Sequence, residues 1–318
     1  MTFPVAQYFQ PLRPLDRPSD EHRYLDIDSS TQMFTRFTET FGDPAEWTSG
    51  GHLIVATGDR GYGKTSLIQR CAYWLRSFQQ QTCQIVVLDL SAESWPEETG
   101  HYWPKGGHDG PVLDGPNPRI IRTFGRIIDK LRASLPVELI SELEKNSTDS
   151  SNFFYYLGQS LKGDWPGGGA SPIVLVVLLA SYSTADEVDL YYKQACPGTF
   201  FFAEIYDLGE TRKVKDQIPG LNQGRNDIQY LTMSVLKSGD GRELADWIRR
   251  ERPGRPELPG EVVRDRFEHL ITERRISISE LNKLAWGVLR WAAKDAADRV
   301  ENIHFNMYYE EMLYRDSA

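Results

Sequence analysis

One stretch of the chain has the residue types and the spacing that bind phosphate groups. It reads Gly58-Asp59-Arg60-Gly61-Tyr62-Gly63-Lys64-Thr65-Ser66 and matches the pattern G-x-x-x-x-G-K-[ST]. Glycines at these places let backbone N–H groups surround an anion, and the lysine can reach the β- and γ-phosphates of a nucleotide. The hydroxyl of Thr65 is the expected ligand of Mg²⁺. We therefore predict that residues 58–66, called the phosphate loop below, bind a nucleoside triphosphate with Mg²⁺.

The residues on either side supply the strand and the helix that such a loop requires. Leu53 to Ala56 is a short apolar run of the kind found in buried strands. After the loop, apolar residues recur at helical spacing, at Leu67, Ile68, Cys71, Trp74, Leu75 and Phe78. A guanine-specific Asn-Lys-x-Asp pattern is missing, because Asn282-Lys283-Leu284 is followed by Ala285. The expected nucleotide is therefore ATP rather than GTP.

Asp89 is a second candidate ligand for Mg²⁺, beside Thr65. It follows the apolar run Ile85 to Leu88, and it could bind the metal if that strand neighbours the strand before the phosphate loop. The alternative is a structural aspartate that caps the loop after the strand. The sequence leaves both roles open.

Hydrolysis of ATP would need a carboxylate that positions and polarises a water molecule. The expected place is the end of the apolar strand 173–179, but Ala180 and Ser181 stand there, and the nearby Asp186 and Glu187 belong with the next helix. The remaining candidates for a catalytic role are few and unsupported by a motif: Glu204, Asp207, Lys283 and Arg225. We therefore expect weak or absent turnover, so ATPase activity stays uncertain.

The elements around these residues alternate between strand and helix. Strands are predicted near 53–56, 85–90, 173–179, 200–205 and 227–236, with helices near 66–78, 119–135, 136–145, 152–162, 184–195 and 241–251. The run Ile85 to Leu88 is continuously apolar, which is typical of parallel sheets covered on both faces. The pattern predicts a doubly wound, mainly parallel α/β sheet.

Composition changes along the chain and suggests three parts. Residues 1–50 form an N-terminal arm rich in proline, followed by a short helix. Residues 51–252 form the nucleotide-binding α/β domain, and residues 253–318 form a helical domain. Within the last part, helices are predicted over 261–274, 277–299 and 306–314, the second opened by the capping box Ser277-x-x-Glu280.

The stretch from Gly58 to Leu67 resembles the phosphate loop of the AAA+ and STAND branch of P-loop ATPases. The helical segment from Leu281 to Ala296 is similar to the C-terminal lid of that branch. The resemblance implies a lid that closes over ATP and a basic residue near the start of a lid helix that senses the γ-phosphate; Lys283 matches that place most nearly. It also implies a setting in bacterial signalling or in defence against phage.

The composition of the chain indicates where in the cell it works and which classes of partner it binds. The net charge of −9 lowers the expectation of DNA as the main ligand, because nucleic-acid binding normally needs a basic surface. The longest apolar run, Ile173 to Ala180, is far shorter than the ~20 residues that span a bilayer. Three cysteines without metal-ligand spacing favour a reducing compartment, so we expect a cytoplasmic protein without a membrane partner.

These observations favour a nucleotide-dependent switch that acts on a protein partner or effector in trans. Formation of a homo-oligomer is possible within this hypothesis. Two alternatives stay open: a DNA-linked AAA+ ATPase that resembles regulators of replication origins or of transposition, and a nucleotide-binding structural subunit without turnover.

Overall fold

The computed structural model describes most of the 318 residues, in the ranges 13–25, 27, 29–78, 83–91, 118–165, 168–169, 171–180, 183–206, 208–217, 226–251, 260–274 and 276–315. The chain forms two compact units that are interleaved in sequence. The first unit, called the lid unit below, contains Met1–Thr35, Gly58–Leu67 and Thr232–Ala318. The second unit, called the sheet unit, contains Arg36–Thr57 and Ile68–Leu231. The predicted three-part division at residues 50 and 252 stays a prediction.

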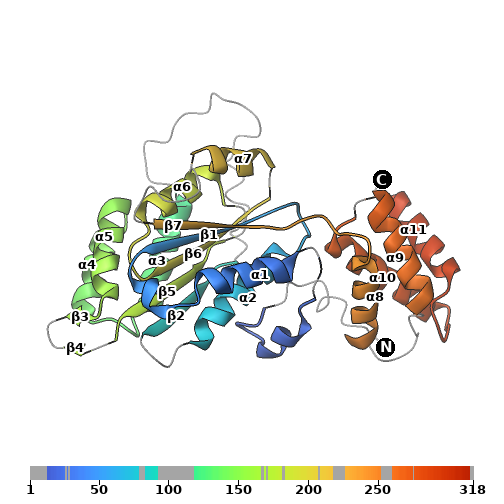
Figure 1. Cartoon of the computed structure of the whole chain (residues 1–318), viewed down its shortest axis with the longest axis horizontal. Helices are drawn as coiled ribbons and strands as arrows, with labels where there is room; N and C mark the ends of the chain where they lie inside the picture. Colours follow the sequence, from blue (N-terminus) through green and yellow to red (C-terminus); the bar gives the residue numbers. More distant parts are fainter. Residues whose placement is uncertain are drawn as a thin grey trace. The chain divides into compact units, whose positions relative to one another are not determined.

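A five-stranded sheet forms the centre of the sheet unit, in the order β2-β5-β6-β1-β7 (Figure 1). The strands are β1 (Gly51–Thr57), β2 (Gln84–Asp89), β5 (Ile173–Leu178), β6 (Thr199–Ile205) and β7 (Asn226–Thr232). β2 pairs with β5, β5 with β6, and β6 with β1, each time in parallel. Every residue of β1, β5 and β6 is buried, as continuous apolar strands require. The predicted doubly wound, mainly parallel α/β sheet is confirmed.

Helices cover the two faces of this sheet. On one face, α1 (Ser30–Thr40) places Phe37 against Phe202 of β6 and against Trp74 of α2 (Lys64–Ser77). The other face carries α3 (Pro118–Leu131), α4 (Val137–Lys145), α5 (Ser150–Leu161) and α6 (Ala185–Gln194), while α7 (Leu208–Gln217) packs on α6. A short 3-10 helix, Pro44–Thr48, and a two-stranded ribbon of β3 (Asp164–Trp165) and β4 (Gly168–Gly169) complete the described elements of the sheet unit. A second 3-10 helix, Pro18–Arg23, belongs to the lid unit.

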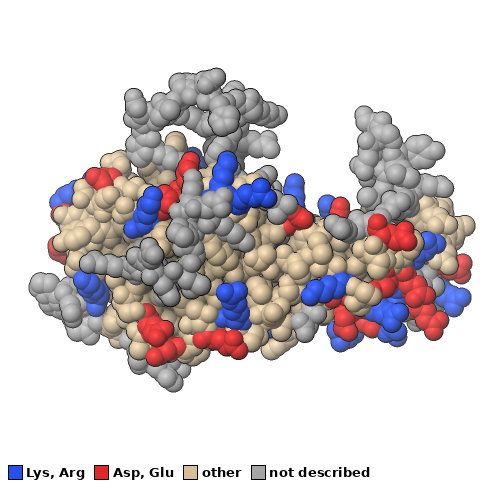
Figure 2. Space-filling view, turned by 45° about the horizontal axis from the view of Figure 1, so that its top comes forward, with Lys and Arg blue, Asp and Glu red and all other residues tan. Residues whose placement is uncertain are grey.

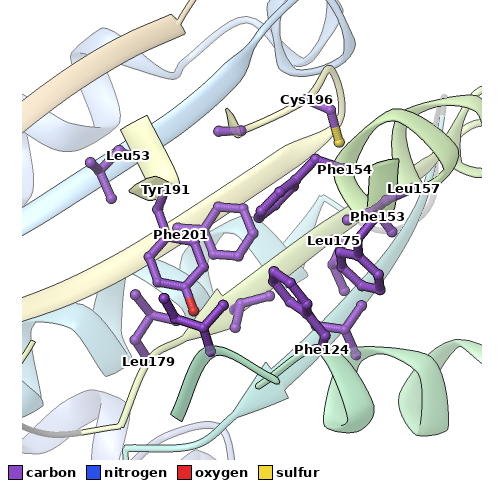
Figure 3. Packing of buried hydrophobic residues seen from close by; sticks show 14 of the residues in the cluster. Leu53, Phe124, Phe153, Phe154, Leu157, Leu175, Leu179, Tyr191, Cys196 and Phe201 are labelled. Atoms are coloured by element: carbon purple, nitrogen blue, oxygen red, sulfur yellow. The ribbon is translucent and has the colours of Figure 1, made fainter. Parts of the chain in front are cut away.

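Aromatic rings fill the space between the sheet and α3, α5 and α6 (Figure 3). Phe124 of α3 stacks on Phe153 of α5, with ring centroids 4.0 Å apart and planes at 12°. Phe154 meets Phe201 of β6 edge-on at 5.8 Å, and Phe201 stacks on Tyr191 of α6 at 4.7 Å. Because these rings join three helices to a central strand, they hold that side of the sheet as one layer.

The C-terminal part of the lid unit contains four helices: α8 (Asp240–Glu251), α9 (Gly260–Arg274), α10 (Ile278–Lys294) and α11 (Asn302–Arg315). α8 packs on α9, and α10 packs on α11. The α10–α11 contact needs a glycine, since a Cβ atom at Gly287 would lie 2.0 Å from the ring of Tyr308.

The predicted helix over 277–299 is wrong at its C-terminal end, because α10 stops at Lys294. Ala296 adopts a left-handed conformation with φ of 51°, which turns the chain out of the helix. The Ala297 N–H then donates to the Ala292 carbonyl at 2.9 Å, so a carbonyl at the helix end keeps a partner.

The three cysteines, Cys71, Cys83 and Cys196, are all buried. Burial raises the pKa of Cys196 to about 12, which keeps this thiol protonated and unreactive at neutral pH. In the described part of the chain, no helix is both long enough and apolar enough to cross a membrane.

Replacing Phe153 by alanine should lower the free energy of unfolding by about 3–5 kcal/mol, because this fully buried ring would leave a cavity. Tyr155→Ala on the same helix is the matched control, since Tyr155 is 60% exposed and its loss should cost less than about 0.5 kcal/mol. Denaturant unfolding of both variants measures the difference. Equal losses would show that the Phe124–Phe153 stack does not stabilise the layer.

Candidate nucleotide-binding loop

The phosphate loop follows β1 directly and leads into α2, as the sequence predicted. Its three glycines all adopt left-handed backbone conformations, with φ of 134° at Gly58, 87° at Gly61 and 81° at Gly63. Side-chain-bearing residues rarely adopt such angles, so the chain can form this loop only with glycine at these places. A backbone of this kind turns successive N–H groups toward one centre, which suits an anion.

Lys64 is almost completely buried at the start of α2, with 2% of its surface exposed. Its Nζ donates to the carbonyl oxygens of Gly58 at 2.7 Å and of Asp59 at 2.6 Å. A buried ammonium group needs several hydrogen-bond acceptors, and the loop supplies them from its own backbone. The side chain therefore reaches back across the loop, as a phosphate-binding lysine must.

Segments distant in sequence pack around this loop within the lid unit. The Tyr24 hydroxyl of the N-terminal arm donates to the Ser66 carbonyl at 2.7 Å, in the first turn of α2. After β7, the chain comes so close to Gly58 that a Cβ atom there would lie 2.9 Å from the Met233 carbonyl oxygen. The next residue, Ser234, donates its N–H to the Ser29 hydroxyl at 3.3 Å. The arm and the segment after β7 therefore fix each other as well as the loop.

The start of α10 lies against Gly61. The Ser279 N–H donates to the Gly61 carbonyl at 3.2 Å. A Cβ atom added to Gly61 would lie 2.8 Å from the Ser277 hydroxyl and 3.0 Å from the Ser279 Cβ. Gly61 is thus required twice, for its left-handed φ and for the close approach of α10.

Asp89 does not meet the condition on which its predicted metal role depended. β2 is separated from β1 by β5 and β6, so its strand does not neighbour the strand that leads into the phosphate loop. The Asp89 carboxylate instead accepts hydrogen bonds from Gln69 Nε2 at 2.6 Å and from the Ser91 N–H and hydroxyl at 2.9 and 2.6 Å. This network matches the alternative role, an aspartate that caps the loop after its strand.

The carboxyl end of β5 has no acid at its expected place. Ala180 is buried there, and its carbonyl accepts a hydrogen bond from Arg119 at 2.6 Å. Arg119 Nε also pairs with Glu187 at 2.9 Å. Glu187 completes the capping box of α6 with Thr184, which confirms that it belongs to that helix. Burial raises the pKa of Glu187, and the Arg119 guanidinium opposes this shift.

The other residues predicted as candidates for a catalytic role lie in different elements of the chain. Glu204 is fully buried on β6 in register with Ala56 of β1, and it accepts a hydrogen bond from the Tyr206 hydroxyl. Lys283 is exposed on α10. Asp207 and Arg225 lie outside the described residues. Among the described residues, no group of three or more His, Cys, Asp and Glu side chains could hold a metal ion.

Sequence reasoning missed the residues that support the loop from outside. Tyr24, Met233 and Ser279 belong to no motif, and the residues they contact are far away in the chain. The capping box at Ser277 placed the start of α10 correctly, but nothing in the sequence indicated that this start meets Gly61.

Several solved structures share this fold. Drosophila ORC bound to DNA has a TM-score of 0.55 and 11% identity, covering 92% of this chain and 62% of that one. The Aeropyrum pernix ORC1 protein in complex with DNA has a TM-score of 0.53 and 14% identity, over 94% and 69% of the two chains. The Aeropyrum pernix ORC2 protein in ADPNP–ADP complexes has a TM-score of 0.51 and 8% identity, over 98% of this chain and 72% of that one.

These likenesses show a shared fold and nothing finer, because the identities are low. The chain spans less than two thirds of the Drosophila ORC chain. No protein-family model matches the chain, and no curated protein matches its sequence.

Gly61→Ala should destabilise the chain by about 1–3 kcal/mol, through a strained φ and a clash with the start of α10. Gly239→Ala is the matched control. Its φ is 101°, but a Cβ atom there would meet nothing within 4 Å, so only the strain of about 1 kcal/mol applies. Thermal and denaturant unfolding compare the two, and a loss at Gly61 no larger than at Gly239 would contradict the close approach.

Proposed function

We propose that the chain binds ATP with Mg²⁺ at the phosphate loop and acts as a nucleotide-dependent switch on a protein partner. The observation that carries the proposal is the loop itself. Gly58, Gly61 and Gly63 adopt the left-handed angles of an anion cradle, and Lys64 lies across it. The loop also includes the first turn of α2, where the helix macrodipole favours phosphate.

The fit to Mg²⁺ rests on Thr65, the second residue of α2, whose hydroxyl is an oxygen ligand of the kind that Mg²⁺ prefers. Asp89 adds little support, because its carboxylate already accepts three hydrogen bonds from Gln69 and Ser91. We therefore infer that Mg²⁺ is held mainly by Thr65, the nucleotide phosphates and water.

Slow turnover is the second part of the proposal. In-line attack on the γ-phosphate needs a positioned and polarised water molecule. Ala180 occupies the expected place of the acid, and Glu187 of the following helix is engaged by Arg119 and Thr184. Glu204 and Asp207 stay weaker candidates for the missing base, and Arg225 stays a candidate for an arginine finger that stabilises charge on the γ-phosphate. A long-lived ATP state suits a switch better than a motor.

The partner would be a separate protein or effector, with self-association of the chain as another form of the same switch. Lys283 on α10 would sense the γ-phosphate if the resemblance to the AAA+ and STAND branch extends to the lid. Bacterial signalling and antiviral defence are the settings that this resemblance suggests. The contact between α10 and Gly61 supports a lid that responds to the loop.

A DNA-linked ATPase is the second candidate, because two of the structures with this fold are complexes with DNA. The net charge of −9 argues against a large electrostatic contribution to DNA binding. On the face shown in Figure 2, the described Lys and Arg side chains are interspersed with Asp and Glu. Exposed Arg122, Arg126 and Lys130 on α3 are the basic residues that such binding would use.

Lys64→Ala should weaken ATP binding by at least about tenfold, because it removes a charged hydrogen-bond donor to the β- and γ-phosphates. The control is Lys145→Ala, an exposed lysine of α4 paired with Glu142, which should leave the affinity unchanged. Isothermal titration with ATP and Mg²⁺ measures both. Equal affinities in Lys64→Ala and the parent would end the assignment of the loop.

Turnover by the purified chain should stay well below about one ATP per second, with or without duplex DNA. Release of inorganic phosphate under saturating ATP and Mg²⁺ measures it. A rate above this limit without DNA would reveal an effective general base and contradict the proposal of slow turnover. Stimulation by DNA that is lost in Arg122→Glu/Arg126→Glu would favour the second candidate.

A further inference from the structure

The contact between α10 and the phosphate loop is made by backbone atoms. Ser279 is the second residue of α10, and N–H groups in the first turn of a helix have no acceptor within the helix. In this chain the Ser279 N–H is used outside the helix, on the Gly61 carbonyl at 3.2 Å. The contact therefore satisfies a donor of α10 and an acceptor of the loop at once.

This hydrogen bond also fixes the orientation of one peptide group. A trans peptide is planar, so the N–H of the residue after a carbonyl points opposite to that carbonyl. With the Gly61 carbonyl directed at Ser279, the Tyr62 N–H is directed away from α10. Gly61 itself has φ of 87°, and a left-handed glycine can rotate this peptide more freely than other residues can.

We propose that Ser279 is a positioning residue for nucleotide phosphate, acting through this peptide: its N–H holds the Gly61 carbonyl so that the Tyr62 N–H is presented to the β-phosphate. The inference rests on the proposed function, since it makes the start of α10 a support of the anion cradle. The donated group is a backbone amide, so the side chain of Ser279 is not required.

The start of α10 is rigid enough for this role. The Ser277 hydroxyl accepts from the Glu280 N–H at 3.3 Å, and Glu280 Oε2 accepts from the Ser277 N–H at 2.8 Å. This capping box fixes the first turn, in which Ser279 lies. Behind it, Leu281 and Leu284 are buried, which anchors the helix in the lid unit.

Coupling of this kind works in both directions. If α10 improves binding of the β-phosphate, bound phosphate must strengthen the hold of the loop on α10 by the same factor. ADP and ATP both carry a β-phosphate, so both should stabilise the contact. The contact between α10 and Gly61 thus responds to any nucleotide with a β-phosphate, whereas discrimination between ATP and ADP needs a group at the γ-phosphate.

The experiment removes the N–H without removing a helical hydrogen bond. Ser279→Pro lacks the donor, and proline is tolerated in the first turn of a helix. Ser279→Ala keeps the donor and loses only the side chain. The dissociation constants of ADP, and of pyrophosphate in competition with labelled ADP, are measured for the parent and both variants, together with their thermal unfolding.

We expect Ser279→Pro to weaken the binding of ADP and of pyrophosphate by about tenfold each. This is the usual effect of one hydrogen bond to a charged group, here lost because the Tyr62 N–H is no longer held in place. Ser279→Ala should stay within about twofold of the parent. A folded Ser279→Pro that binds both ligands like the parent would overturn the proposal. So would a loss for ADP alone, since the effect would then lie at the base or ribose. A parent chain that binds neither ADP nor ATP would instead contradict the proposed function.

A second variant keeps the test informative if Ser279→Pro does not fold. Ser277→Ala removes the cap that holds the first turn of α10, at a typical cost of about 1 kcal/mol in stability. Its match is Asp149→Ala, which removes the N-cap of α5 in the sheet unit, where Asp149 accepts from the Asn152 N–H at 3.1 Å. Only Ser277→Ala should weaken the binding of ADP and of pyrophosphate. Equal affinities in the two cap variants would count against the proposal.

Discussion

A Cβ atom at Gly58 or Gly61 would come within 3.0 Å of atoms from the C-terminal part of the chain, so the loop backbone itself is a packing surface. At the same two places φ is positive. A side chain there would strain the backbone and separate the loop from Met233 or from the start of α10. The shape of the phosphate loop and the packing of the lid unit therefore depend on the same two glycines.

The local part of this arrangement could be predicted from the sequence. The phosphate loop, the strand before it and the helix after it follow from residue types within about 25 positions of one another. The capping box at Ser277 and Glu280 fixed the start of α10 for the same reason, since both hydrogen bonds lie within one turn. The apolar run Ile85 to Leu88 and the alternation of strands and helices indicated a parallel sheet, and β2 pairs with β5 in parallel.

Interactions between distant residues could not be predicted in this way. The order of the strands decides whether Asp89 neighbours the loop strand, and that order is set by which buried faces fit together. The hydrogen bond from Ser279 to Gly61 joins two backbone groups, which carry no signature in the residue types. The end of α10 was missed because Ala296 adopts a left-handed angle that alanine rarely takes.

The interleaving of the two units affects how far each unit can fold while a ribosome is still making the chain. The N-terminal arm and the phosphate loop emerge early, but the residues that pack on them begin at Thr232. Domains usually fold as they leave the ribosome, starting from the N-terminus. Here the sheet unit can pack its core first, whereas the phosphate loop lacks its packing partners until the last segment has been translated. A nascent chain that stops before α10 would hold the complete phosphate-binding motif without the helix that packs against Gly61.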